Sequence, residues 1–169
     1  MSDDLRKLKP FFSGINEDDK EKLDELFNIY KSHFHEEIVN IRGAKLKVKI
    51  HPYNPQKDHL PDFYANYYEK FVHLITRKNY KTKRREFQPE RAVRIHWIKV
   101  VLENYESNLI TYFKFKEADG SIWDYFWYKK KNYMVILEKI NSEFLLITAF
   151  CVDKDNQLYY KKKEMNQIQ

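Results

Sequence analysis

The sequence predicts an α+β protein in which N-terminal helices precede a helix packed on a four-stranded antiparallel meander sheet. Three observations support this prediction. Apolar residues recur at helical spacing through the first hundred residues, apart from one short alternating stretch. Residues 109–152 are rich in β-branched and aromatic side chains, and their strand-like segments are joined by short links. Short links between consecutive strands favour antiparallel pairing, because parallel strands need long crossovers.

The N-terminal region is predicted to hold two helices and one strand. Asn16 is placed to cap a helix over Glu17–Val39, whose exposed face is acidic. Ala44–Ile50 alternates apolar and basic residues, which is typical of a half-exposed strand. After a proline-rich loop, an apolar stripe predicts a second helix over Pro61–Thr76.

The C-terminal region begins with a third helix and continues as strands. Pro89 suits the first turn of a helix that contains Arg91–Asn104. The predicted strands are Leu109–Lys116, Ser121–Lys129, Tyr133–Lys139 and Phe144–Val152, and Leu158–Lys163 is read as an edge strand or a terminal helix. The basic stretch Arg77–Arg85 is read as a hinge, so the predicted regions are 1–80, mainly helical with one strand, and 81–169, the sheet domain.

Composition excludes several classes of site. The chain has one cysteine, Cys151, and three glycines, so it has neither an internal disulfide, a cysteine-based zinc site nor a glycine-rich phosphate loop. No metal or cofactor is expected. A charged N-terminus and the absence of a long apolar run predict a cytoplasmic protein without a membrane partner.

The charge is unevenly distributed. Residues 1–40 hold six Lys/Arg against ten Asp/Glu, a net charge of −4, and the remainder holds twenty-five against fifteen, a net charge of +10. A basic body favours a polyanionic partner such as nucleic acid. Surface lysines that serve only solubility would give the same net positive charge, so charge alone leaves both interpretations open.

The predicted helix Arg91–Asn104 has two apolar faces and therefore is expected to lie between layers. Arg91 and Arg94 fall near its sheet-facing side, where a desolvated guanidinium needs an anionic partner. A carboxylate such as Glu138 and a phosphate both satisfy this need. His96 lies on a separate polar strip, away from the arginines.

Several ordered blocks within about residues 84–164 resemble a known family. The blocks are Arg91-Ala92-x-Arg94-Ile95-x-Trp97-Ile98-Lys99 with Leu102-Glu103-Asn104, Tyr125-x-Trp127, Tyr133-x-Val135-Ile136-Leu137-Glu138-Lys139, and Leu146-Ile147-Thr148-Ala149-Phe150-x-Val152-Asp153. In this order they resemble the phage-associated branch of the barnase–EndoU–colicin E5/D–RelE-like nucleases. The resemblance does not cover the first eighty residues.

The resemblance implies a barnase/RelE-like fold and metal-independent cleavage of RNA, such as tRNA, by a toxin of phage or prophage type. Arg91 and Arg94 would stabilise the phosphorane and Thr148 would bond the phosphate. His96 is the candidate base because its pKa lies near neutrality, although its position departs from the expected block. Tyr125 or Trp127 would stack on a base. An immunity protein or antitoxin is the other partner that the resemblance implies.

Two alternatives remain open from the sequence. A non-catalytic nucleic-acid-binding protein would use the basic stretches, which contain Arg84, Arg85, Lys129, Lys130, Lys131 and residues 161–163. A phage-encoded interaction or inhibitor protein would use the acidic helix Glu17–Val39 as its contact surface.

Overall fold

A computed structural model describes residues 2–169 and divides them into two compact units. The sheet unit consists of the residues up to Leu8 together with Ile38–Lys47 and Trp97–Gln169. The hairpin unit consists of Lys9–Glu37 and Val48–His96. Each unit is therefore assembled from segments that are distant in the sequence.

The sheet unit is built on one six-stranded mixed sheet. Its strands are β1 (Asn40–Ile41), β2 (Ala44–Lys47), β5 (Thr111–Lys116), β6 (Ile122–Tyr128), β7 (Tyr133–Ile140) and β8 (Glu143–Cys151), in the order β1-β2-β8-β7-β6-β5. The strands β5 to β8 pair antiparallel with their neighbours, whereas β2 runs parallel to β8.

The protein is α+β, but the prediction of a four-stranded antiparallel meander sheet is wrong. The four expected strands are present, and β2 and β1 extend them at the β8 edge. Lys45 pairs with Glu143 and Leu46 with Phe144, so this addition joins segments about a hundred residues apart. The alternation of Ala44–Lys47 indicates a strand, but alternation does not identify the partner strand.

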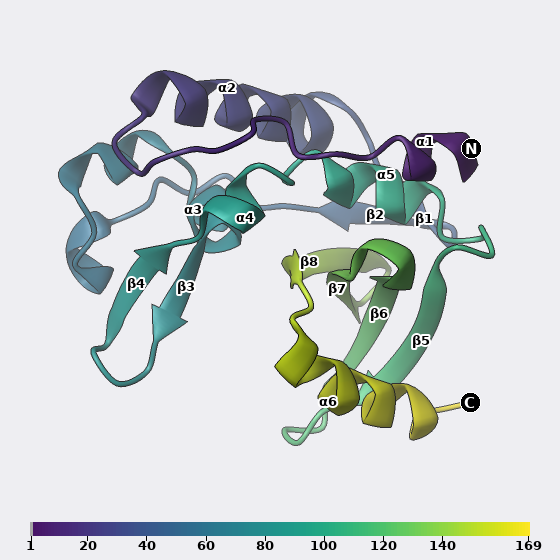
Figure 1. Cartoon of the computed structure of the whole chain (residues 1–169). Helices are drawn as coiled ribbons and strands as arrows, with labels where there is room; N and C mark the ends of the chain where they lie inside the picture. Colours follow the sequence, from purple (N-terminus) through teal and green to yellow (C-terminus); the bar gives the residue numbers. More distant parts are fainter. Residues whose placement is uncertain (1) are drawn as a thin grey trace. The chain divides into compact units, whose positions relative to one another are not determined.

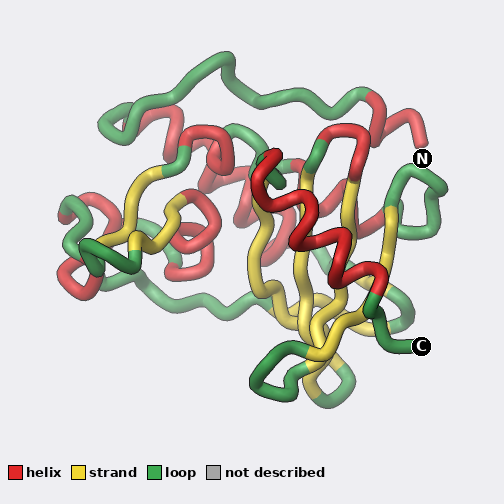
Figure 2. Tube along the Cα trace, turned by 60° about the horizontal axis from the view of Figure 1, so that its bottom comes forward, coloured by secondary structure: helices red, strands yellow, loops and turns green. Residues whose placement is uncertain are grey.

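The sheet curls into a half-barrel (Figure 2). The turn between β1 and β2 is tight, with positive φ at Arg42 (52°) and Gly43 (80°). From this turn the Arg42 guanidinium reaches the ring of Tyr112 on β5, 4.5 Å from its centroid. Because β1 and β5 are the two edges of the sheet, this contact requires strong curvature.

Helices cover both faces of the curled sheet. The helix α6 (Lys154–Met165) lies across the strands in Figures 1 and 2, and its Tyr160 packs against an aromatic cluster that includes Phe113 and Trp127. On the other face, Trp97 of α5 (Trp97–Glu103) makes an edge contact with Tyr133 of β7 at 5.2 Å. The segment 158–163, expected as an edge strand or a helix, is therefore helical.

The sheet unit also contains α1 (Ser2–Arg6) and the 3-10 helix η4 (Lys129–Lys131), and the hairpin unit holds the other elements. They are α2 (Lys20–Lys31), a π-helix η1 (Ser32–Glu36), the 3-10 helices η2 (Pro55–Asp58) and η3 (Asp62–Asn66), α3 (Glu69–Ile75), β3 (Thr76–Asn79), β4 (Arg84–Phe87) and α4 (Pro89–Ala92). The helix expected over Pro61–Thr76 is interrupted at Tyr67 and Tyr68, whose backbones are extended. The interruption follows from pairing, because Tyr68 bridges to Pro52 and the Glu69 amide donates to the His51 carbonyl at 2.7 Å.

The single helix predicted over Arg91–Asn104 is also wrong. The chain forms α4 and α5 instead, separated by turns over residues 93–96. Here the Arg94 and Ile95 amides donate to carbonyls three residues back, at 3.2 and 3.3 Å, rather than four. β-Branched residues and histidine favour the helix less than alanine or leucine does, so this stretch has a weak preference for a continuous helix.

Candidate nucleic-acid interface

The basic stretch read as a hinge folds into a separate two-stranded antiparallel hairpin, β3–β4 (Figure 1). Asn79 organises its turn, because the Asn79 side-chain oxygen accepts from the amides of Lys81 and Thr82 at 3.0 and 3.3 Å. Lys83 closes the turn. Its φ is 63°, and its backbone amide donates a hydrogen bond to the Asn79 carbonyl at 2.9 Å. Residues 76–87 contain six Lys/Arg and one Glu, a net charge of +5.

Alternation along the two strands gives the hairpin two faces. In the pairing register, Arg77 lies opposite Glu86 and Asn79 opposite Arg84, and these four side chains form the outer face. The inner face carries Thr76, Lys78, Arg85 and Phe87, which are buried or half-buried.

Arg85, a predicted RNA-binding residue, anchors the inner face to α3. Its Nε donates to the Thr76 hydroxyl at 2.8 Å, and its Nη2 lies 3.2 Å from the Thr76 carbonyl and 3.4 Å from that of His73. The Thr76 hydroxyl in turn donates to the Val72 carbonyl at 2.6 Å. The inner face therefore fixes the hairpin, while the outer face is left to solvent.

A buried carboxylate supports the same inner face. Asp58 accepts a hydrogen bond from the Tyr53 hydroxyl, and Lys78 Nζ lies 3.5 Å from its Oδ1. Burial opposes ionisation of Asp58, but the Tyr53 bond and the charges of Lys78 and Arg85 outweigh it and lower the pKa of this carboxyl. Lys78 is thus partly neutralised by an ionised carboxylate of its own unit.

A hollow of about 460 Å³ is lined mainly by the outer face and the turn, with Lys78 contributing from the inner face; its lining residues are Arg77, Lys78, Asn79, Tyr80, Lys81, Glu86 and Gln88. Tyr80, at the hairpin tip, is 79% exposed. Four side chains of this hairpin are exposed and have no ion-pair partner among the side chains of residues 4–169: Arg77, Lys81, Lys83 and Arg84. Cations that follow a backbone and an aromatic ring that stacks on bases are the two features of single-strand nucleic-acid sites.

The catalytic candidates fall into both units. In the hairpin unit, Arg91 Nη1 donates to the Thr76 carbonyl at 3.3 Å, Arg94 Nη1 to the Glu90 carbonyl at 2.8 Å, and His96 Nε2 lies 3.0 Å from the Lys9 carbonyl. Burial lowers the pKa of His96. Thr148 belongs to the sheet unit, where it pairs with Ile136 beside a register shift. The convergence of these residues on one phosphate stays a prediction.

Tyr125 and Trp127, the predicted stacking residues, are core residues of the sheet unit. Their exposed fractions are 0% and 1%, which leaves no ring face open to a base. The Tyr125 hydroxyl donates a hydrogen bond to Glu117 at 2.8 Å and accepts one from Lys163 Nζ at 2.9 Å. Lys163 itself is buried and pairs with Glu117 at 2.7 Å.

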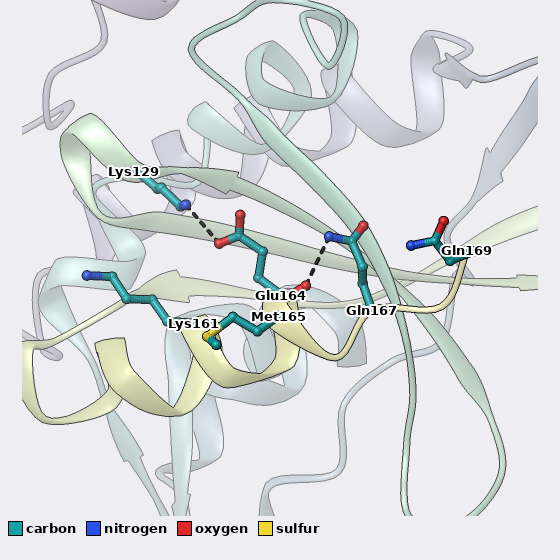
Figure 3. Close-up of a pocket in the computed structure, with 6 residues that line it drawn as sticks. All are labelled: Lys129, Lys161, Glu164, Met165, Gln167 and Gln169. Atoms are coloured by element: carbon teal, nitrogen blue, oxygen red, sulfur yellow. Dashed lines mark hydrogen bonds and ion pairs between the residues drawn. The ribbon is translucent and has the colours of Figure 1, made fainter.

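The other two basic stretches, 129–131 and 161–163, share one hollow to which each contributes a lysine. Lys129 and Lys161 line a second hollow, of about 410 Å³, beside α6 (Figure 3). Lys129 pairs there with Glu164 at 2.8 Å, and Lys131 donates to the carbonyls of Arg6 and Leu8. Lys130 is exposed. Half of these six lysines, Lys129, Lys131 and Lys163, are thus engaged within the protein.

Sequence reasoning recognised the hairpin cations but missed Tyr80. The signal was present, because this tyrosine interrupts a run of basic residues, and basic residues interleaved with an aromatic one are typical of nucleic-acid sites. It also missed Asp58, whose pairing with Tyr53 and Lys78 depends on the tertiary fold.

Comparisons with protein-family models, curated proteins and solved structures find no match for this chain. In the part of the chain that the structure describes, no group of three or more His, Cys, Asp or Glu side chains is arranged to hold a metal ion. None of the helices described has the length and apolar character that crossing a membrane requires. The hairpin geometry therefore carries the functional argument.

Proposed function

We propose that this protein binds single-stranded RNA through the outer face of the β3–β4 hairpin. The observation that carries the proposal is Tyr80, which is 79% exposed at the tip of a hairpin with a net charge of +5. Stacking of one base on an aromatic side chain contributes about 1–3 kcal/mol. The neighbouring cations, Arg77 and Lys81, would neutralise phosphates on either side of the stacked base.

The two basic stretches of the sheet unit, 129–131 and 161–163, have three exposed lysines without an acceptor among the described residues, whereas the hairpin has four such cations beside one exposed aromatic ring. Lys129, Lys131 and Lys163 already serve acceptors within the protein, and an RNA phosphate would have to displace these contacts. The four exposed cations of the hairpin have no such internal competitor among the described residues. The hairpin is therefore the favoured surface.

Substitutions on the hairpin should separate stacking from charge. We expect Tyr80→Ala to weaken binding of a labelled single-stranded RNA by roughly tenfold, and Tyr80→Phe to retain binding, because stacking requires only the ring. We expect Arg77→Ala to reduce the slope of log affinity against log salt by about 0.7, the value for one phosphate contact on a single strand. Fluorescence anisotropy at several salt concentrations measures both.

Lys162→Ala is the matched control, because it removes an exposed cation from the other basic surface. Its salt slope should equal that of the wild type. If Lys162→Ala reduces the slope and Arg77→Ala does not, the hairpin is not the RNA-binding surface.

Metal-independent RNA cleavage is the second proposal, with RNA such as tRNA as substrate and an immunity protein or antitoxin as inhibitor. The observation that favours it lies at the base of the hairpin, where the guanidiniums of Arg85 and Arg91 both reach the Thr76 carbonyl. Arg85 Nη2 also lies 3.4 Å from the His73 carbonyl, and burial lowers the pKa of His73 to about 4, so its imidazole adds no positive charge at neutral pH. A cleavage reaction through the 2′-hydroxyl needs such cations to stabilise the phosphorane.

Incubation of the pure protein with RNA in EDTA tests the cleavage proposal. We expect products ending in 2′,3′-cyclic phosphate, and a loss of about a hundredfold in rate for Arg91→Ala or Arg94→Ala if they stabilise the phosphorane. Arg84→Ala, at saturating RNA, should cleave at the wild-type rate because Arg84 is assigned to binding alone. Intact RNA with every variant would reject cleavage and leave the RNA-binding proposal standing.

A further inference from the structure

We propose that the outer-face hollow of the hairpin recognises one guanine base of the bound strand, with Glu86 as the residue that determines specificity. This inference rests on the proposed RNA binding and names the base that the same surface selects. The volume of about 460 Å³ lies within the ~300–1,000 Å³ of pockets that hold small organic groups.

The lining residues divide by chemistry. Arg77 and Lys81 supply positive charge, and Tyr80 supplies a ring for stacking. Glu86 is different, because it is the one acidic residue of 76–87 and its carboxylate only accepts hydrogen bonds. A carboxylate repels phosphate, so its presence in this hollow favours a base edge that donates.

The hairpin holds Glu86 in position and leaves it acceptor capacity. Asn79 Nδ2 donates to Glu86 Oε1 at 2.6 Å, and the side-chain Nε2 of Gln88 donates to the Glu86 backbone carbonyl at 3.4 Å. An ionised carboxylate has about four lone-pair sites on its two oxygens, so the Asn79 bond occupies only one of them. The remaining sites can accept two parallel N–H groups, as they do from a guanidinium fork.

Among the four RNA bases, guanine alone presents two adjacent donors on its Watson–Crick edge, the N1–H and the N2 amino group. Adenine and cytosine present an amino group beside an acceptor, and uracil presents a single N–H between two carbonyls. Single-stranded RNA is read at such edges, because its bases are unpaired and can turn outward. The carboxylate of Glu86 therefore fits guanine best, while Tyr80 stacks on its ring and Arg77 and Lys81 contact flanking phosphates.

The test uses uridine heptamers whose central base is guanine, adenine, cytosine, uracil or hypoxanthine, with affinity measured by fluorescence anisotropy. We expect the guanine heptamer to bind roughly tenfold more tightly than the uridine heptamer, as a bidentate contact provides. Hypoxanthine keeps N1–H but lacks the amino group, and it should lose most of this advantage. A deoxyribose version of the guanine heptamer should bind more weakly than the ribose version. Equal affinity of the two would contradict the proposal that the ligand is RNA rather than DNA.

Glu86→Gln should abolish the guanine preference without weakening binding of the uridine heptamer, since the new amide keeps an oxygen for Asn79. Glu90→Gln is the matched control, because Glu90 is exposed in the same unit but does not line the hollow. Equal affinity for all five heptamers overturns guanine recognition and leaves RNA binding intact. A uniform gain for Glu86→Gln on every heptamer also overturns it, and absence of any binding overturns the proposed function itself.

Discussion

Lys163→Ala is expected to lower the free energy of unfolding of the sheet unit by about 3 kcal/mol, because it leaves the largely buried Glu117 side chain without its counter-charge. Lys163 Nζ lies 2.7 Å from Glu117 Oε1 and 2.9 Å from the Tyr125 hydroxyl. The side chains of the two charged partners are only 10% and 14% exposed, so solvent screens the pair weakly.

Aromatic rings surround the same ammonium group. It lies 4.9 Å from the ring centroids of both Phe115 and Tyr159 and 5.3 Å from that of Tyr125. Burial and the neighbouring Glu117 raise the pKa of Tyr125, so this hydroxyl stays protonated and donates to the carboxylate. Lys163 is thus the residue through which α6 closes a buried polar cluster over β5 and β6.

Tryptophan fluorescence during urea unfolding measures the effect in the correct unit, because Trp97, Trp123 and Trp127 all belong to the sheet unit. Lys129→Ala is the control. It breaks a surface pair with Glu164 of similar length, 2.8 Å, and should cost about 0–1 kcal/mol. A double variant, Lys163→Met with Glu117→Gln, should recover part of the loss because no buried charge remains. Equal losses for Lys163→Ala and Lys129→Ala would contradict the buried-pair interpretation.

The second large effect is a loss of stability of the hairpin unit as the pH falls from 6.5 towards 4. Burial, followed by the charges of Arg85 and Lys70, lowers the pKa of His73 from 6.5 to about 4. Below pH 6.5 the unfolded imidazole binds a proton that the folded one does not, so acid favours unfolding. Because one pKa unit corresponds to about 1.4 kcal/mol, His73 alone should account for about 2–3 kcal/mol between these pH values.

A difference measurement isolates this residue. The free energy of unfolding of wild type and His73→Phe is compared by urea denaturation, followed by circular dichroism, at pH 7.5, 6.5, 5.5 and 4.5. His35 and His96, whose pKa values burial also lowers, remain in both proteins and cancel. The wild type should lose more stability than His73→Phe over this range, and parallel curves would show that His73 does not titrate as described.

Local sequence patterns predicted much of the sheet unit. The strands β5 and β6 lie within their predicted segments, and β7 and β8 match theirs to within one residue at each end, because alternation and short links are local signals. The parallel addition of β2 to β8 was missed, since it depends on contacts between residues such as Leu46 and Phe144. A strand of four residues with two lysines gives no indication of the sheet it joins.

The hairpin shows why the site was only half predictable. Arginine and lysine are poor indicators of strands, so β3 and β4 were read as a hinge. The hairpin is stabilised by the Asn79 turn at its tip and, at its base, by the burial of Thr76 and the hydrogen bonds that join half-buried Arg85 to Thr76 and α3. The positive charge could be counted in the sequence, but the exposure of Tyr80 and the position of Glu86 beside Asn79 required the fold.

The interleaving of the two units has a consequence for how this protein changes during evolution. The chain passes from one unit to the other after Leu8, Glu37, Lys47 and His96. No single breakpoint separates the units, and an exchange at residue 80 would divide β3 from β4. A single crossover therefore divides at least one unit wherever it falls between Leu8 and the C-terminal segment, so one crossover cannot exchange the unit of the cationic hairpin or that of the half-barrel whole and leave the other unit intact.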